Sequence, residues 1–171
     1  MESLKKYLIE SSLNSLYDSA VDAFPKTKMR QHATEPITIE NTIWIPFVGM
    51  KTLFVKSKTK NENREYNSII VFKNVNYEPN DNIVQLFASD NKIYNLENLS
   101  LEDNDVLVRC NCNDFNWRFN YYNHLDKSLY NNKRKKYESN GGPPANPKEL
   151  PGMCKHLMKT VSTLKEAGLF K

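Results

Sequence analysis

Hydrophobic residues near the start of the chain recur at spacings of three to five positions. Polar and charged residues fill the gaps between these apolar positions, which are Leu4, Leu8, Leu13, Leu16, Ala20, Val21 and Phe24. The pattern predicts an amphipathic helix over residues 3–24, so we take residues 1–24 as the first unit of the chain. Pro25 and the basic residues after it predict that the helix ends there and that a short linker follows.

The period of the pattern changes to two after Pro36. Apolar and polar residues alternate over residues 37–47, as they do on a strand with one buried face. Residues 48–50 predict a hairpin connection, and the polar residues 58–65 predict a loop. Further strands are predicted at residues 53–55, 66–75, 83–87, 93–94 and 106–108. We therefore expect a β-rich domain over residues 36–108, folded as a small antiparallel sheet or barrel.

The last part of the chain combines a loop with a helix. Glycine and proline are frequent in residues 137–151, which excludes a regular helix or a central strand there. Apolar residues then recur with helical spacing at Leu157, Met158, Val161 and Leu164. They predict a helix over residues 153–167, with Gly168 as its stop signal. The expected fold class is α+β, with an N-terminal helix, an antiparallel sheet or barrel and a C-terminal helix.

Composition supports a folded chain that lies outside the secreted and membrane classes. Its 171 residues are 39% hydrophobic and 26% charged, which suits one domain, or a compact domain with a small appended module. The chain has three cysteines, an odd number that excludes a full disulfide framework but leaves room for a single bridge. Because charged residues interrupt the apolar positions at the N-terminus and no later segment is long enough to span a bilayer, we expect neither an export signal nor a membrane anchor.

The net charge of +4 is unevenly distributed along the chain. Residues 133–171 contain nine Lys or Arg and three Glu, which gives +6 and leaves −2 for residues 1–132. A basic segment of this kind can meet phosphates or an acidic protein partner. Charge alone does not choose between these two partners.

All three cysteines and one histidine form two closely spaced pairs, Cys110 with Cys112 and Cys154 with His156. Three thiolates and one imidazole are the donor set of a structural, tetrahedral zinc site. Positions 113–153, which are 41 residues, separate the two pairs, so we expect a zinc-binding module over residues 109–171 with a long insert. Two residues along a helix differ by about 200° in direction. Cys154 should therefore lie in the turn that enters the helix, where the helix dipole favours a thiolate.

Other arrangements of these four residues stay open at this point. One disulfide with a free thiol, or unligated thiols packed in the core, are the alternatives to zinc. The alternation of a strand places Cys110 and Cys112 on the same face, which argues against chance packing. A catalytic pair of Cys154 and His156 is disfavoured because neighbours at i and i+2 point apart, and the chain has no phosphate loop or known nucleophile motif. We expect a protein that is not an enzyme.

The insert between the two pairs is aromatic and basic. Its aromatic residues, Phe115, Trp117, Phe119, Tyr121, Tyr122 and Tyr130, precede a basic run of Lys133, Arg134, Lys135 and Lys136. Interleaved aromatic and basic residues can stack on bases and neutralise phosphates. We favour the interpretation that Phe115, Trp117 and Phe119 alternate to cover the zinc site. For the basic run, two interpretations remain open: contact with nucleic acid or an acidic partner, and a solvated loop. His32 and His124 are expected to be ordinary exposed histidines.

The order of ligands, Cys-x-Cys followed by Cys-x-His, resembles the SWIM-type zinc finger. The wider string around it includes Val108 to Cys112 and Pro151 to Leu157, and over residues 106–160 it is similar to a SWIM-like segment in virion proteins of large tailed bacteriophages. The abundance of Asn and Lys suits an AT-rich phage such as a crAss-like one. This resemblance implies a structural protein of the virion, made in the host cytoplasm, in a tail ring or head-to-tail connector.

The same resemblance implies partners for the chain. They would be other virion proteins and further copies of the chain in a homo-oligomer or ring. SWIM fingers elsewhere are linked to binding of DNA or protein, so a nucleic-acid-binding zinc-finger protein is the alternative. Because the 41-residue insert exceeds that of compact fingers, no DNA-contacting residue is carried over to this chain.

Overall fold

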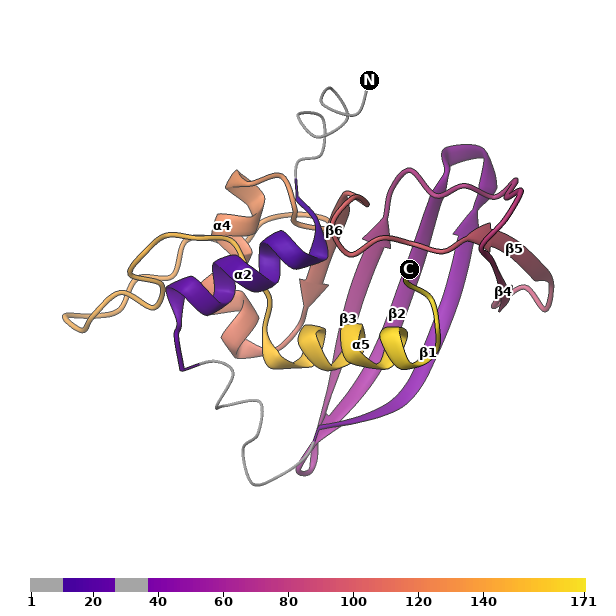
Figure 1. Cartoon of the computed structure of the whole chain (residues 1–171). Coiled ribbons are helices and arrows are strands. Elements are labelled where there is room, and N and C mark those ends of the chain that lie inside the picture. Colours follow the sequence, from indigo (N-terminus) through magenta and orange to yellow (C-terminus); the bar gives the residue numbers. More distant parts are fainter. Residues whose placement is uncertain (1–10, 27–36) are drawn as a thin grey trace, which may run out of the picture.

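The computed structural model describes residues 11–26 and 37–171. It confirms the α+β class, with an N-terminal helix, antiparallel sheets and a C-terminal helix (Figure 1). The elements are α2 (Leu13–Ala23), β1 (Thr38–Phe47), a 3₁₀ turn (Val48–Met50), β2 (Thr52–Asn61), β3 (Arg64–Phe72), β4 (Ile83–Phe87), β5 (Ile93–Glu97), β6 (Val106–Cys110), a π-helical turn (Phe115–Phe119), α4 (Asn120–Leu125) and α5 (Lys155–Glu166). The helix predicted over residues 3–24 is confirmed only from Leu13, because Ser12 is extended and its side chain caps α2; residues 3–10 lie outside the described residues.

The main sheet has four antiparallel strands in the order β1-β2-β3-β6, and β4 and β5 form a separate hairpin. The barrel expected as an alternative is therefore wrong, because the described strands form an open sheet with β1 and β6 at its edges. The outer edge of β6 is covered by residues 128–130 instead. Val108 N–H donates to Ser128 O at 2.8 Å, and Tyr130 N–H donates to Val108 O at 3.1 Å.

The predicted loop at residues 58–65 is also wrong, since β2 and β3 continue through it to a tight turn after Asn61. Lys60 pairs with Glu65 and Asn61 with Arg64 in the antiparallel register. One face of this hairpin is buried through Thr59, while the other face is charged. In the sequence, the charged residues of this face are typical of a loop. Ion pairs that cross the two strands, such as Lys58 with Glu65 at 2.8 Å, become apparent only in the structure.

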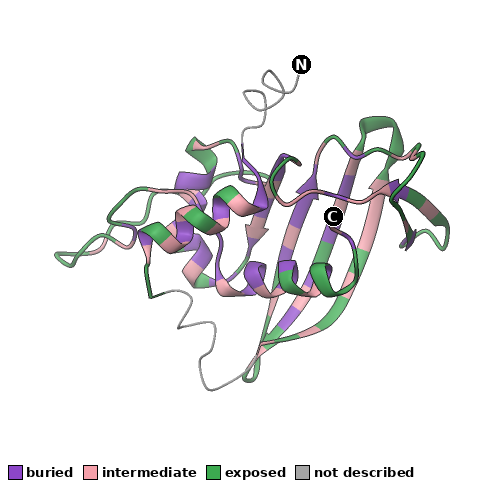
Figure 2. Ribbon diagram, viewed as in Figure 1, coloured by how far each residue is buried: buried purple, intermediate pink, exposed green. Residues whose placement is uncertain are grey.

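The core lies between one face of the main sheet and the helices. In Figure 1, α5 crosses that face, and α2 lies beside it over the β6 side of the sheet. Alternate residues of each strand point inward, so Val55, Ile70 and Val108 meet in one buried row. Figure 2 shows the same alternation as purple bands along the strands. The α-helices contribute Leu13, Leu16, Leu157 and Leu164 to the cluster.

This hydrophobic cluster contains residues from all three predicted units of the chain, 1–24, 36–108 and 109–171. Within the described ranges, every helix is too short or too polar to cross a bilayer.

Candidate metal centre

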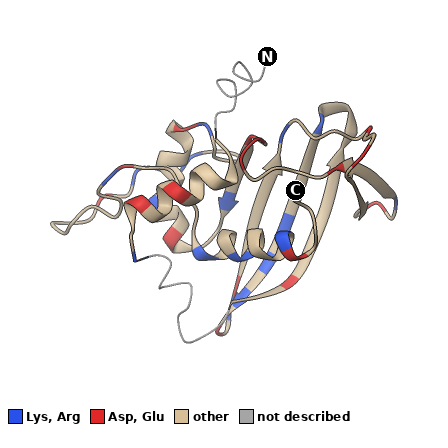
Figure 3. Cartoon of the chain, viewed as in Figure 1, with Lys and Arg blue, Asp and Glu red and all other residues tan. Residues whose placement is uncertain are grey.

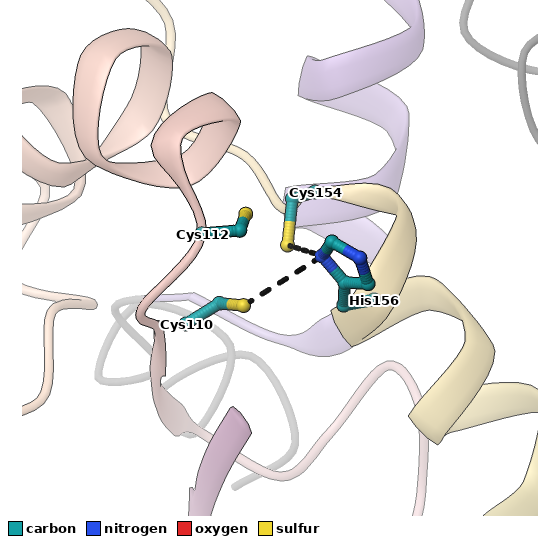
Figure 4. Close-up of side chains that lie close together, drawn as sticks. All are labelled: Cys110, Cys112, Cys154 and His156. Carbon is teal, nitrogen blue, oxygen red and sulfur yellow. Dashed lines mark hydrogen bonds between the residues drawn. The ribbon is translucent and has the colours of Figure 1, made fainter. Parts of the chain in front are cut away.

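Cys110, Cys112, Cys154 and His156 converge at the junction of sheet and C-terminal helix. Their ligand atoms all lie within 4.8 Å of one another. The Sγ atoms of Cys110 and Cys154 are each 3.9 Å from His156 Nδ1 (Figure 4). All four side chains are buried, with at most 3% of their surface exposed. The predicted meeting of the two pairs is confirmed, and the cluster is close enough to hold a metal ion.

The first pair is positioned by the end of the sheet. Pairing of β3 with β6 ends at Ser68 opposite Cys110, whose side chain points to the buried face. Asn111 then extends the register, because its N–H donates to Asn67 O at 3.1 Å and its side-chain oxygen accepts from Asn67 N–H at 2.9 Å. The chain next turns into the π-helical segment, where Phe115 N–H donates to Cys112 Sγ at 3.3 Å. A backbone donor to sulfur stabilises the thiolate, the form that binds metal.

The second pair is positioned by the start of α5. Cys154 is the N-cap residue with φ −78° and ψ 171°, an extended conformation outside the helix. Its carbonyl accepts the N–H of Met158 at 3.0 Å, which begins the helical hydrogen bonding. Because Cys154 is not helical, its sulfur and the His156 ring both point to the cluster. This confirms the prediction that Cys154 lies in the entering turn.

The electrostatics of the cluster favour one thiolate among the three sulfurs. Hydrogen bonding, first from Cys112 and then from Cys154, holds the pKa of Cys110 well below its ordinary value. The Cys110 sulfur in turn raises the pKa of Cys112 to about 12. Burial raises the pKa of Cys154 well above its usual range. The three thiols therefore differ in how readily they ionise, and a divalent cation is the group that would stabilise all three as thiolates.

The orientation of His156 identifies its ligand atom. Nδ1 faces the sulfurs, whereas Nε2 is buried and has no hydrogen-bond partner within the described parts of the chain. The Tyr66 ring lies against the imidazole, with centroids 4.3 Å apart and an interplanar angle of 32°. Nδ1 is therefore the nitrogen placed to bind a metal ion, and such binding would leave the ring proton on Nε2.

A polar clamp missed by sequence reasoning holds the loop that enters α5. The buried Asn123 side chain accepts the N–H of Gly152 at 2.8 Å and donates to the Gly152 carbonyl at 2.9 Å. Asn146 bridges the same loop to the π-helical turn by donating to Arg118 O and Leu150 O, at 2.9 and 2.7 Å. The signal in the sequence was the helical spacing of Asn116, Asn120 and Asn123, which the general abundance of Asn concealed.

The prediction that Phe115, Trp117 and Phe119 alternate over the metal site is wrong. They lie on a π-helical turn, so Phe115 and Phe119 share a buried face, while Trp117 points outward with 49% of its surface exposed. The outer Trp117 ring stacks on Tyr137, with centroids 5.2 Å apart and an interplanar angle of 23°.

The basic run Lys133, Arg134, Lys135 and Lys136 is exposed and contributes no ligand to the cluster. Lysine and arginine also occur on the strands and on α5 (Figure 3), so the run is not the only basic feature. Its backbone is held in place, because Arg134 N–H donates to the buried Asn120 side chain at 2.8 Å. His124 is exposed as expected, and His32 lies outside the described residues.

Comparisons with protein-family models, curated proteins and solved structures find no match to this chain. The functional argument therefore rests on the residues and geometry described above. They define a small α+β protein with a buried Cys₃His cluster suited to a metal ion.

Proposed function

We propose that the chain is a zinc-stabilised structural protein of a tailed-phage virion, made in the host cytoplasm and acting by protein–protein assembly. The observation that carries this proposal is the buried convergence of three sulfurs and one imidazole between β6 and α5. A cross-link of this kind ties the C-terminal helix to the sheet. The placement in a tail ring or head-to-tail connector follows from the SWIM-like resemblance alone.

Zinc is the metal that the donor set favours. Bonds of about 2.3 Å to sulfur and about 2.0 Å to nitrogen give ligand-to-ligand edges of about 3.5–3.8 Å in a tetrahedron. The 3.9 Å separations of His156 Nδ1 from the Cys110 and Cys154 sulfurs are close to these edge lengths. No two ligand atoms are more than 4.8 Å apart, so binding of the ion would draw any two of them together by at most about 1 Å. A centre with four protein ligands has no open position for a substrate, so the metal would stabilise the fold without taking part in catalysis.

Exposed apolar residues support a role in assembly. Phe87 and Ile93 are cross-strand partners on the outer face of the β4–β5 hairpin, and 66% and 65% of their surfaces are exposed. Phe47 and Met50, near the β1–β2 connection, form a second exposed apolar site. Apolar patches on different elements suit a contact between unlike surfaces of two neighbouring copies. Repetition of such a contact generates a ring when the rotation between successive copies closes on itself. We therefore propose a further copy of this chain as the partner of the hairpin.

Metal analysis and native mass of the purified protein test both parts of the proposal. We expect one zinc per chain and an oligomer. Phe87→Lys should shift the oligomer towards monomer, whereas Leu125→Lys, at an exposed leucine on α4, should not. A monomeric wild-type protein that is also missing from phage particles by mass spectrometry would contradict the assembly role. Protein purified without bound metal under reducing conditions would contradict the zinc site.

A nucleic-acid-binding zinc-finger protein is the second candidate. It is favoured by the exposed basic run, in which Lys133, Arg134 and Lys135 form no ion pair with a carboxylate of the described residues. Retention of the protein on nucleic acid at moderate salt, without assembly into an oligomer, would favour this candidate over the first.

A further inference from the structure

An exposed aromatic pair lies directly beside the basic run. Trp117 and Tyr137 stack on each other, and 49% and 42% of their surfaces are exposed. Together with Arg134, Lys135 and Lys136 they line one shallow depression, which we call the basic-aromatic surface. It lies on the outer side of the π-helical turn, opposite the face that carries the buried Phe115 and Phe119.

The stacked pair is a platform that offers aromatic surface to a ligand. In a stacked arrangement each ring covers one face of its neighbour, and the exposed fractions of Trp117 and Tyr137 leave ring surface accessible to a third planar ring. Base-on-aromatic stacking needs this geometry and tolerates any sequence, because every base has a π-face. An exposed indole is uncommon on a solvated loop and is typical of a binding surface.

The cations beside the platform are presented on a fixed backbone. Arg134 N–H is anchored to Asn120, a side chain that is completely buried. Just upstream, the Arg109 guanidinium donates to the carbonyls of Tyr130 and Asn132 at 3.0 and 2.8 Å. These bonds hold Tyr130 and Asn132 against β6 and Arg134 against α4. A fixed backbone lowers the entropy cost of binding an extended ligand.

The positive charge of this surface is partly compensated. Glu138 also lines the depression. Lys136 lies 3.5 Å from Glu149, with both side chains well exposed, and this is its ion pair. Lys133, Arg134 and Lys135 have no such partner within the described ranges. Burial, and after it the positive charge of Arg134, lowers the pKa of Arg109. An anionic ligand would relieve this repulsion.

We infer that the basic-aromatic surface and the adjoining Lys133 bind single-stranded nucleic acid, with phosphates on Lys133, Arg134 and Lys135 and a base stacked on the Trp117–Tyr137 pair. The duplex is excluded as the preferred ligand because its bases are stacked on each other and offer no free face. An acidic peptide would use the cations and leave the aromatic platform unused. The inference rests on the second candidate function and is independent of zinc binding and of assembly.

The test measures anisotropy of labelled oligo(dT) and oligo(rU) with the full, metal-loaded chain. We expect both probes to bind better than a duplex of equal length, and the stronger probe identifies DNA or RNA as the ligand. Affinity should fall with salt with a log–log slope of about −2, since each of three phosphate contacts adds about −0.7. Binding should also quench tryptophan fluorescence, and this quenching should be largely lost in Trp117→Phe, where Trp44 is the remaining indole.

Variants separate the stacking contact from the charge contact. Trp117→Ala should weaken binding at least about fivefold, and Trp117→Phe should restore much of it because a phenyl ring also stacks. Lys133→Glu with Lys135→Glu should weaken binding and flatten the salt dependence. The matched control, Lys56→Glu with Lys92→Glu, changes the net charge equally at exposed lysines on other elements and should bind as the wild type does.

Three results would overturn the inference. The first is equal binding of oligonucleotide by the wild type, by Trp117→Ala and by the Lys133/Lys135 variant. The second is equal affinity for duplex and single strands. The third is binding of poly-glutamate by a protein that binds neither oligonucleotide. The last result would reassign the surface to an acidic protein partner. Zinc content and native mass recorded on the same samples distinguish these outcomes from failure of the structural proposal.

Discussion

Asn123 holds both polar groups of the Gly152 backbone. Its side-chain amide donates to the Gly152 carbonyl at 2.9 Å and accepts the Gly152 N–H at 2.8 Å, and the site is fully buried. Gly152 lies two residues before Cys154, so this clamp sets the path of the chain into the metal cluster. The insert between the ligand pairs is thus connected to the cluster through an asparagine that binds no metal.

Replacement of Asn123 by alanine should destabilise the protein by roughly 2–5 kcal/mol, because two buried backbone groups lose their partners at about 1–3 kcal/mol each. Asn123→Asp keeps the acceptor but buries a carboxylate against the Gly152 carbonyl, so its effect should be at least as large. Urea denaturation of the metal-loaded protein measures both. Asn140→Ala, at an exposed asparagine in the loop, is the control and should change stability little. Equal stability of Asn123→Ala and wild type would show that the clamp is not formed.

Gly152→Ala should destabilise the protein by about 1–3 kcal/mol through overpacking. A Cβ at this position would lie 2.6 Å from Phe119 Cε1 and 2.9 Å from Ala20 Cβ, so α2 or the π-helical turn would have to move. Gly142→Ala is the matched control, since its nearest neighbour is 3.8 Å away. Thermal unfolding of both variants distinguishes a steric effect from the general effect of replacing glycine. The double variant with Phe119→Leu should recover part of the loss.

Removal of the metal should expose all three thiols of the chain. The sulfurs are buried together, and in the zinc-bound form we expect them to react slowly with an alkylating reagent. Addition of a strong chelator should accelerate the reaction to three thiols per chain and lower the melting temperature, because metal binding contributes to folding. Fast modification of Cys154 alone, unaffected by chelator, would instead indicate a reactive thiol. Peptide mass spectrometry identifies the modified residue.

The helical register of the insert predicts losses of stability of different size for Phe119 and Trp117. Phe119→Ala removes a side chain that is 2% exposed and should cost about 3–5 kcal/mol. Trp117→Ala removes the outward ring and should cost about 1 kcal/mol, the value of its stacking on Tyr137. Chemical denaturation measures both variants. Similar losses for the two would support the alternating arrangement that the structure rejects.

Several elements could be predicted from the sequence because their signals are local. The helical period fixed α5, the period of two fixed β1, and the proline- and glycine-rich stretch fixed the loop before Cys154. The pairing of Cys110 and Cys112 with Cys154 and His156 could also be predicted, since no other residues of the chain offer thiolates for a soft metal ion. Each of these inferences needs only residue type and spacing.

Other features depended on contacts between distant residues. Residues 58–65 look like a loop until the diagonal ion pair of Lys58 with Glu65 across the two strands is seen, and the open sheet is decided by which strands meet β6. The direction of Trp117 follows from a π-helical turn whose hydrogen bonds no spacing rule predicts. The helical spacing of Asn123 with Asn116 and Asn120 does not reveal its partner, which lies 29 positions away.

The sequence by itself determined the class of fold, the four metal-ligand candidates and the entry of Cys154 through a turn, because these follow from period, donor chemistry and local backbone preference. Tertiary structure alone decided how β6 is covered at its edge, which aromatic ring of the insert faces solvent and which asparagine holds the loop at Gly152. These choices depend on burial and on hydrogen bonds between residues far apart in the chain. Such pairings are fixed only when the whole core packs.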